Sequence, residues 1–99
     1  MKVEFLTVAN QEYLSAIEFY NLQNDGLGLK FKREVDSSIK RIIQYPDAWM
    51  SETVSTRRIL LKIFPYKIVY LIDKDKDKVV VVAIANTHRR PFYWVSRLV

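Results

Sequence analysis

The sequence predicts an α+β fold in which an N-terminal helix hairpin packs on one face of an antiparallel meander sheet. Apolar residues recur every three or four positions across residues 27–42, which is typical of an amphipathic helix. From residue 54 onward they recur at every second position, which is typical of strands. The expected order of elements is β-α-α-β-β-β. They form one domain over residues 1–99, a length that leaves no room for a second core.

A strand and a helix are expected first. Residues 2–8 alternate as a short strand, and Asn10 is a plausible N-cap for the helix that follows. Glu12 would then lie in the first helical turn, where the helix dipole favours a negative charge. Apolar residues at helical spacing predict a helix over residues 10–23, and Asn24-Asp25-Gly26 ends it.

The second helix is predicted by one continuous stripe. The stripe consists of Leu27, Phe31, Val35, Ile39 and Ile42, and it stops before Tyr45-Pro46, where proline cannot continue a helix. So short a glycine-containing turn predicts that the two helices form an antiparallel hairpin. Aromatic residues at helical spacing are expected to belong to the core rather than to a base-stacking surface. They are Tyr13, Phe19, Tyr20 and Phe31.

Three strands are expected in the second half of the chain. The first includes Ile59, Leu61 and Ile63 on one face, the second covers residues 66–72 and the third covers residues 79–85. The charged stretch at residues 73–78 begins like a calcium-binding loop. It lacks the glycine and the final glutamate of such a loop, so we expect a solvated hairpin turn and no metal site.

Composition limits the classes of protein to consider. There is no cysteine, which excludes disulfides and thiolate metal sites. The N-terminus has no signal-peptide pattern, and the longest apolar run is too short to cross a bilayer. We therefore expect a cytoplasmic protein with no membrane contact and no cofactor.

Positive charge is concentrated in the second half. Residues 1–56 contain six Lys/Arg and eight Asp/Glu, whereas residues 57–99 contain ten and three. Arg58 and Lys62 are expected on one strand face, with Lys67 just across the turn, and no acidic residue occurs between Thr53 and Ile72 to neutralise them. This asymmetry favours an acidic partner, either a nucleic acid or an acidic protein segment, although a basic soluble domain would also explain it.

The C-terminal stretch adds further basic and aromatic side chains. They are His88, Arg89, Arg90, Tyr93, Trp94 and Arg97. Arginines among aromatics suit phosphate contacts and base stacking, while a basic terminus that caps the sheet is the alternative. RNA cleavage without a metal needs a proton acceptor, a proton donor and cations around the phosphate, which His88, Tyr93 and the arginines could supply.

The chain resembles the RelE/ParE family of toxins nearly end to end. The matching pieces are Ala16-x-x-Phe19-Tyr20, Leu27-Gly28-x-x-Phe31, Ile42-x-x-Tyr45-Pro46, Arg58-x-Leu60-x-x-x-Phe64-Pro65-Tyr66-x-Ile68-x-Tyr70 and Ala83-Ile84-x-x-x-His88-x-Arg90-x-x-x-Trp94-x-x-Arg97. The resemblance implies the toxin of a type II toxin–antitoxin system. It also implies a hetero-oligomer with a cognate antitoxin, whose acidic, partly disordered C-terminal segment folds onto the toxin.

The resemblance leaves two branches open. RelE-like members are metal-independent nucleases that cut mRNA on the ribosome, and here His88, Arg89 and Tyr93 would be catalytic. ParE-like members, often labelled plasmid-stabilisation proteins, are not nucleases and act on DNA gyrase. We expect the ParE-like branch, because Leu60 stands where the nucleases carry a second strand cation and because the ending Pro91-x-x-Trp94 is similar to ParE sequences.

Six residues are expected to bind the target whichever branch applies. They are Arg58, Lys62, Lys67, Arg90, Trp94 and Arg97. Charged side chains at strand ends and termini rarely support a core, so Arg58, His88, Arg90 and Arg97 are expected to be dispensable for folding. A nucleic-acid-binding module without toxicity would use the same basic surface and is the third interpretation.

Overall fold

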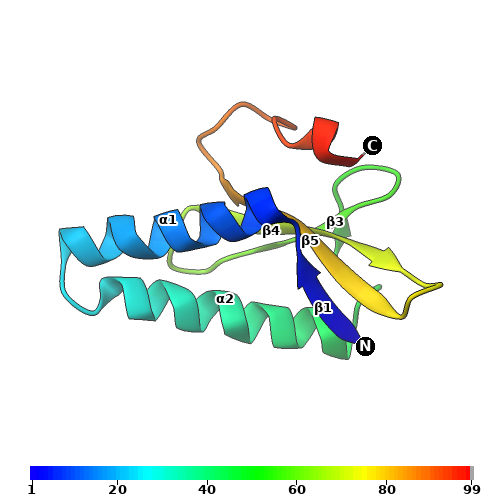
Figure 1. Cartoon of the computed structure of the whole chain (residues 1–99), viewed down its shortest axis with the longest axis horizontal. Coiled ribbons are helices and arrows are strands. Elements are labelled where there is room, and N and C mark those ends of the chain that lie inside the picture. The colour runs from blue at the N-terminus through cyan, green and yellow to red at the C-terminus, as the bar shows by residue number, and fades with distance from the viewer. Residues whose placement is uncertain (99) are drawn as a thin grey trace.

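The computed structural model describes residues 1–98 and has the predicted α+β architecture, with two helices against a five-stranded sheet (Figure 1). The elements are β1 (Lys2–Phe5), α1 (Thr7–Gln23), α2 (Leu27–Gln44), β2 (Met50–Ser51), β3 (Arg57–Leu60), β4 (Tyr66–Asp73), β5 (Lys78–Asn86) and the 3-10 helix η1 (Val95–Leu98). None of the described helices is long and apolar enough to cross a membrane.

The sheet contains the predicted meander and two strand pairings that were not predicted. Its strand order is β1-β5-β4-β3-β2, and β3, β4 and β5 pair antiparallel, as expected. β1 pairs parallel with β5, since the helix hairpin carries the chain back across the sheet. β2 pairs with β3 at the other edge, and two residues are too few to show a period in the sequence.

The boundary between β1 and α1 lies earlier than predicted. β1 ends at Phe5 and α1 begins at Thr7, so residue 10 is inside the helix rather than at its N-cap. The Asn10 amide donates to the Leu6 carbonyl at 2.9 Å, as in a first helical turn. The sequence conceals this boundary because Leu6 and Val8 are apolar at positions where an alternating strand would be polar.

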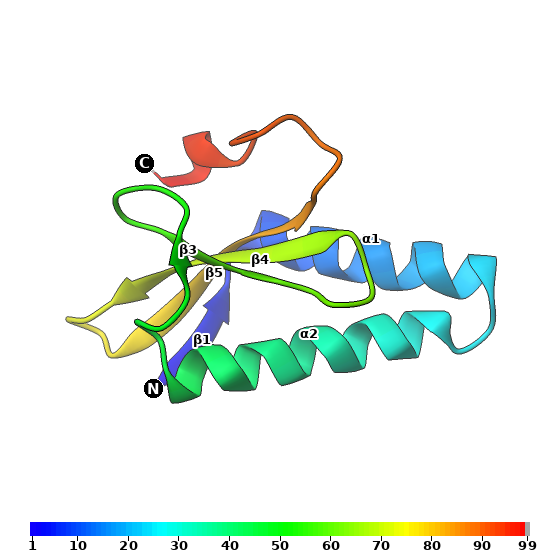
Figure 2. The same cartoon turned by 180° about the vertical axis from the view of Figure 1, so that it is seen from behind.

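The two helices lie antiparallel and approach each other closely, as predicted (Figures 1 and 2). Gly26, with φ of 85°, makes the turn in the left-handed conformation that glycine adopts readily. Gly28 opens α2 at the contact with α1, where a Cβ would lie 2.4 Å from the Ile17 carbonyl oxygen. The absence of a side chain at residue 28 is therefore what lets the hairpin close.

The strand predicted through residue 63 ends earlier, at Leu60. The Glu34 side chain of α2 accepts hydrogen bonds from the amides of Lys62 and Ile63, which removes both donors from the sheet. Leu61 is buried but Ile63 is 62% exposed, so the prediction that Ile63 shares one apolar strand face with Ile59 and Leu61 is wrong. The carboxylate of an earlier helix ends this strand, and alternation within the strand cannot predict that.

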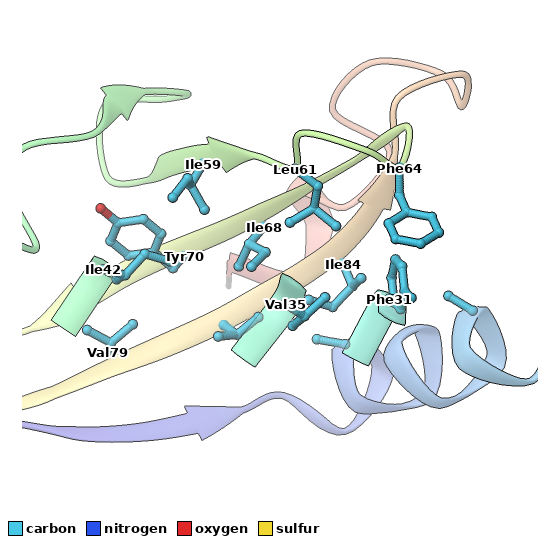
Figure 3. Close-up of a cluster of buried hydrophobic side chains, with 13 residues drawn as sticks. Phe31, Val35, Ile42, Ile59, Leu61, Phe64, Ile68, Tyr70, Val79 and Ile84 are labelled. Carbon is cyan, nitrogen blue, oxygen red and sulfur yellow. The ribbon is translucent and has the colours of Figure 1, made fainter. Parts of the chain in front are cut away.

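The main core lies between the helix hairpin and one face of the sheet (Figure 3). Its buried residues include Phe31, Val35 and Ile42 from the α2 stripe, as predicted. Tyr13 and Tyr20 pack against it half-buried. Phe19 is 53% exposed, so its predicted place in the core is wrong.

A second apolar cluster covers the opposite face of the sheet. Trp94 is fully buried there with Val69, Val82, Ala83 and Ala85. The pairing of β4 with β5 shifts register between Val69 and Tyr70, and Val82 has no partner across the strands. This bulge turns two consecutive residues, Val82 and Ala83, toward the second face. The C-terminal segment, residues 87–98, therefore packs on the sheet face that the helices leave open.

Candidate functional site

The second face of the sheet and the C-terminal segment enclose a pocket of about 260 Å³ that is rich in cations. Its lining residues, which we call the basic pocket, are Arg58, Leu60, Lys67, Ala85, Asn86, Thr87, Arg89, Arg90, Pro91, Phe92, Tyr93 and Trp94. Leu60 of β3 pairs directly opposite Lys67 of β4, which sets an apolar side chain beside that cation. The C-terminal segment brings Arg89 and Arg90 to the same pocket. The fold thus collects four cations that the sequence places in two separate stretches.

A carboxylate that the sequence analysis missed lies against the strand cations. Glu52 has a 3% exposed side chain, and its two oxygens lie 2.8 Å from Arg58 Nη1 and 2.6 Å from Lys67 Nζ. Burial is the largest single influence and raises the pKa of Glu52, but the hydrogen bonds and positive charges of Lys67 and Arg58 together outweigh it, and the net effect lowers this pKa. The expectation of unneutralised strand cations is therefore wrong. The neutralising acid precedes Thr53 and so lies just outside the acid-free stretch.

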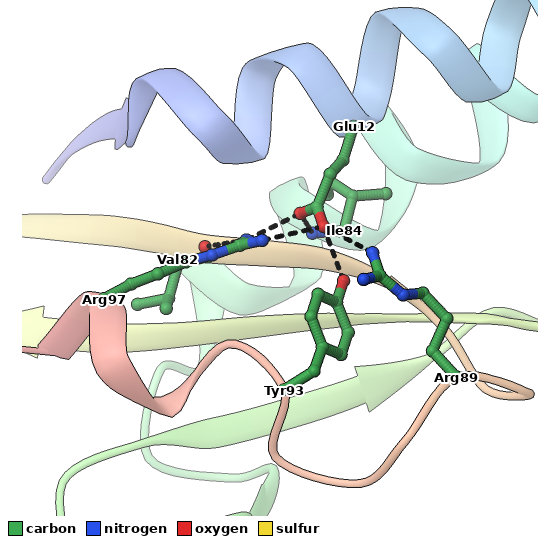
Figure 4. A network of polar contacts seen from close by, with 6 residues as sticks. All are labelled: Glu12, Val82, Ile84, Arg89, Tyr93 and Arg97. Atoms are coloured by element: carbon green, nitrogen blue, oxygen red, sulfur yellow. Dashed lines mark hydrogen bonds and ion pairs between the residues drawn. The ribbon is translucent and has the colours of Figure 1, made fainter.

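A second missed carboxylate fastens the C-terminal segment (Figure 4). Glu12 of α1 accepts hydrogen bonds from Arg97 Nη1 at 2.8 Å, Arg97 Nη2 at 3.0 Å and the Tyr93 hydroxyl at 2.5 Å. It also accepts the Ile84 amide of β5 at 3.1 Å. The Arg89 guanidinium lies 3.8 Å from the Tyr93 ring centroid, and its Nη1 lies 3.8 Å from a Glu12 oxygen, so both residues hold Arg89. The sequence predicted Glu12 in the first helical turn, but α1 begins at Thr7 and its first turn has no acidic residue, so that prediction is wrong. The actual partners of Glu12 lie more than 70 residues away, where no local pattern indicates them.

The hydroxyl of Tyr93 is committed to Glu12. Burial, followed by the hydrogen bond to Glu12 and its negative charge, raises the pKa of Tyr93. The group therefore stays protonated at neutral pH and donates to a carboxylate at 2.5 Å. A phenol held in this way is a poor proton acceptor.

The other residues that sequence analysis selected fall in different environments. Lys62 follows the end of β3 and lines a separate hollow beside Trp49 and Met50, outside the basic pocket. The His88 side chain is exposed and does not line the basic pocket.

Two residues expected to bind the target also make contacts within the fold. Trp94 borders the basic pocket, but its side chain is fully buried in the second cluster, which leaves little surface for a target to contact. Arg97 pairs with Glu12 and donates to the Val82 carbonyl at 3.1 Å. Arg58 and Arg97 each pair with a mostly buried carboxylate, so we expect their removal to cost stability, unlike the dispensable cations that the sequence predicted.

An apolar groove lies beside the basic pocket, between α1 and the C-terminal segment. It measures about 350 Å³, and we call it the helix groove. Ala16, Phe19 and Ile84 supply apolar surface, while Arg89 and Glu12 lie at its polar end. The C-terminal segment forms one wall of this groove through Arg89 and Tyr93.

This element order, with a helix hairpin on one sheet face and a basic pocket on the other, defines a small toxin domain of the RelE/ParE kind. The chain belongs to the ParE toxin family of type II toxin–antitoxin systems, whose family model matches residues 3–91. A search of curated proteins finds no match.

Solved structures agree on the fold. The chain resembles a protein of the chromosomal ParDE toxin–antitoxin system of P. aeruginosa, with a TM-score of 0.75, 13% identity, and coverage of 89% of this chain and 97% of that one. It also resembles the isolated E. coli RelE toxin, with a TM-score of 0.68, 17% identity and coverage of 99% and 98%. A third neighbour is an E. coli RelE mutant in complex with a RelBc antitoxin peptide, with a TM-score of 0.68, 15% identity and coverage of 96% and 92%.

Proposed function

We propose that this toxin acts in the ParE-like manner, inhibiting growth through DNA gyrase, and that a cognate antitoxin neutralises it. The observation that carries the proposal is a basic pocket that has cations but lacks a free acid–base pair. Membership of the ParE family supports the same branch.

The cations of the basic pocket suit the binding of an acidic surface. Arg89 and Arg90 are exposed, while Arg58 and Lys67 are partly covered and share Glu52. One buried carboxylate among four cations leaves a net positive charge. Complementary charge of this kind speeds association with an acidic partner and selects among partners.

Proton transfer is poorly supported in the same pocket. The Tyr93 hydroxyl donates to Glu12 and His88 lies outside the lining, so neither of the two expected acid–base groups is free beside the cations. Leu60 lies opposite Lys67, where a nuclease would need another positive charge on the phosphate. These features favour a toxin that works by binding a protein target, without chemistry of its own.

The antitoxin is proposed to use the helix groove. Its apolar lining suits one side of an amphipathic segment, and Arg89 at its polar end suits an acidic residue of that segment. The RelE neighbour bound to an antitoxin peptide supports this mode of neutralisation by analogy.

The RelE-like nuclease is the second candidate. The observation that favours it is the meeting of Arg58, Lys67, Arg89 and Arg90 in one pocket beside Tyr93. Such a nuclease would be metal-independent. It would need a target-bound state in which the Tyr93 hydroxyl leaves Glu12.

Expression in a growing culture tests toxicity before the target is sought. Expression of the toxin alone should arrest growth, and co-expression with the adjacent small gene should restore it. Unimpeded growth with verified folded protein would contradict an active toxin and would favour the non-toxic nucleic-acid-binding alternative. Gyrase supercoiling and cleavage of mRNA on programmed ribosomes then separate the two branches.

A further inference from the structure

Glu12 connects three parts of the chain that are far apart in the sequence (Figure 4). It lies on α1, and its partners are the Ile84 amide of β5, the Tyr93 hydroxyl and the Arg97 guanidinium of the C-terminal segment. Its side chain is 15% exposed, and that of Arg97 is 16% exposed. The pair is therefore largely shielded from solvent, where ionic hydrogen bonds are less weakened by water.

The backbone of β5 explains why a carboxylate and a guanidinium are needed here. β1 ends at Phe5, opposite Val81, so no strand continues along this edge of β5 at Ile84. The Ile84 amide would lack a partner without Glu12, and the unpaired Val82 carbonyl accepts from Arg97. Buried backbone groups must be hydrogen-bonded, so these two side chains complete the strand while pairing with each other.

Few other polar contacts hold the end of the chain. Among the described residues, hydrogen bonds that join residues 90–98 to the helices and sheet end on Glu12 or on the Val82 carbonyl. η1 has four residues, and so short a 3-10 helix is not stable by itself. Thr87 bonds to the Pro65 carbonyl at the start of the segment, so the position of the remaining residues, 90–98, depends on two anchors, the burial of Trp94 and the contacts of Glu12.

The segment held in this way carries half of the cations in the basic pocket. Arg89 and Arg90 come from it, while Arg58 and Lys67 come from the sheet. The Tyr93 ring lies against both arginines that flank it, with the Arg89 guanidinium at 3.8 Å and that of Arg97 at 5.2 Å from its centroid. Glu12 fixes Tyr93, and Arg89 is supported both by the Tyr93 ring and by its own ion pair with Glu12 at 3.8 Å.

We propose that Glu12 is a positioning residue of the toxin. It clasps the C-terminal segment to β5 and so keeps Arg89 and Arg90 beside Arg58 and Lys67. The clasp itself is independent of what the toxin binds, whereas its effect on activity rests on the proposed function. Loss of the Glu12 carboxylate should release the segment and disperse the cations while the helix hairpin and sheet persist.

The test uses Trp94 as a reporter in a Trp49→Phe background, which leaves Trp94 as the single tryptophan. Glu12→Gln keeps an acceptor for the Ile84 amide and removes the charge that pairs with Arg97. Arg97→Gln breaks the same pair from the other side. Glu18→Gln, an exposed glutamate on the same helix, is the matched control.

Glu12→Gln and Arg97→Gln should both make Trp94 accessible to acrylamide and raise amide exchange of residues 90–98 about tenfold or more, with β4 and β5 still protected. Glu18→Gln should match the parent protein. A fold-wide role for Glu12 would instead raise exchange in the core strands as well, and that result would overturn the proposal. Unchanged quenching and exchange in Glu12→Gln and Arg97→Gln would overturn it too.

Inhibition of gyrase provides the second test of the proposal. Inhibition of gyrase by Glu12→Gln should weaken about tenfold or more, since misplaced binding groups lose affinity although each is still present. If the parent protein does not inhibit gyrase, the proposed function fails, while fluorescence and exchange still decide the role of Glu12. Full inhibition by a variant whose C-terminal segment is released would contradict the positioning role.

Discussion

Glu52 accepts a hydrogen bond from Arg58 at 2.8 Å and does so with its side chain only 3% exposed. The second oxygen of Glu52 pairs with Lys67 at 2.6 Å. A buried carboxylate thus joins β3 and β4 beneath the basic pocket. Removing one partner of such a pair leaves the other charge buried and unpaired, which is costly.

We expect Glu52→Gln to lower the free energy of unfolding at neutral pH by about 1–3 kcal/mol, because the pair is largely shielded but its cations are partly exposed. The pKa of Glu52 is lowered by folding, so its contribution is present above the ordinary value of 4.5 and is lost as pH falls below that value. Urea unfolding of both proteins from neutral to acidic pH checks this. A difference in stability that persists unchanged in acid would contradict the ion pair.

Arg90→Ala should abolish toxicity and leave folding nearly intact. Arg90 is exposed and lines the basic pocket, and surface substitutions of this kind change stability by only about 0.5 kcal/mol. Growth after induction and the melting temperature check the two parts. Lys30→Ala, an exposed cation on α2, is the control and should remain toxic. Toxicity that survives Arg90→Ala would show that this cation is only solvated surface.

Phe19→Ala should weaken binding of the antitoxin about tenfold or more, since exposed aromatics in grooves commonly dominate binding energy. Phe19 is 53% exposed and lines the helix groove, whereas Leu22 is 81% exposed on the same helix and does not line it. Leu22→Ala is therefore the matched control. Calorimetric titration with the purified antitoxin would measure both affinities. Equal losses for the two variants would place the antitoxin elsewhere.

Gly28→Ala should destabilise the helix hairpin by about 2–3 kcal/mol, because the added Cβ would lie 2.4 Å from the Ile17 carbonyl and the helices must separate. Gly26→Ala meets no atom within 4 Å but must adopt a φ of 85°, so we expect a smaller loss of about 1 kcal/mol. Thermal unfolding of both variants compares the loss of stability from a steric clash at residue 28 with the loss from a strained backbone conformation at residue 26. A larger effect at Gly26 would reverse this assignment.

The secondary structure and burial of a segment could be predicted where its apolar residues follow one local pattern. The stripe of α2 predicts its core face, and the alternation of β4 and the continuous apolar run of β5 predict buried strands. Pairings between strands that are distant in the sequence produce no local pattern, so they could not be predicted in this way. β1 is parallel to β5 through a crossover, and β2 has only two residues.

The charge pattern of the sequence indicated the cations of the basic pocket. It did not indicate the carboxylates that pair with them. Arg58, Lys67, Arg89 and Arg90 do meet in one pocket. The roles of Glu12 and Glu52 were not predicted, because each residue acts through contacts that only the folded chain brings together. From the sequence we expected Trp94 to bind the target. In the structure its side chain is buried on the sheet face that the helices leave uncovered.

Incubation of the purified toxin with gyrase and, in parallel, with programmed ribosomes tests the central claim most directly. We expect inhibited supercoiling or trapped cleaved DNA and intact mRNA, because Tyr93 is committed to Glu12 and Leu60 interrupts the strand cations. Primer extension reads the mRNA and gel electrophoresis reads the DNA. Active gyrase together with codon-phased mRNA cuts that vanish in His88→Ala or Tyr93→Phe would contradict the ParE-like account and establish the nuclease.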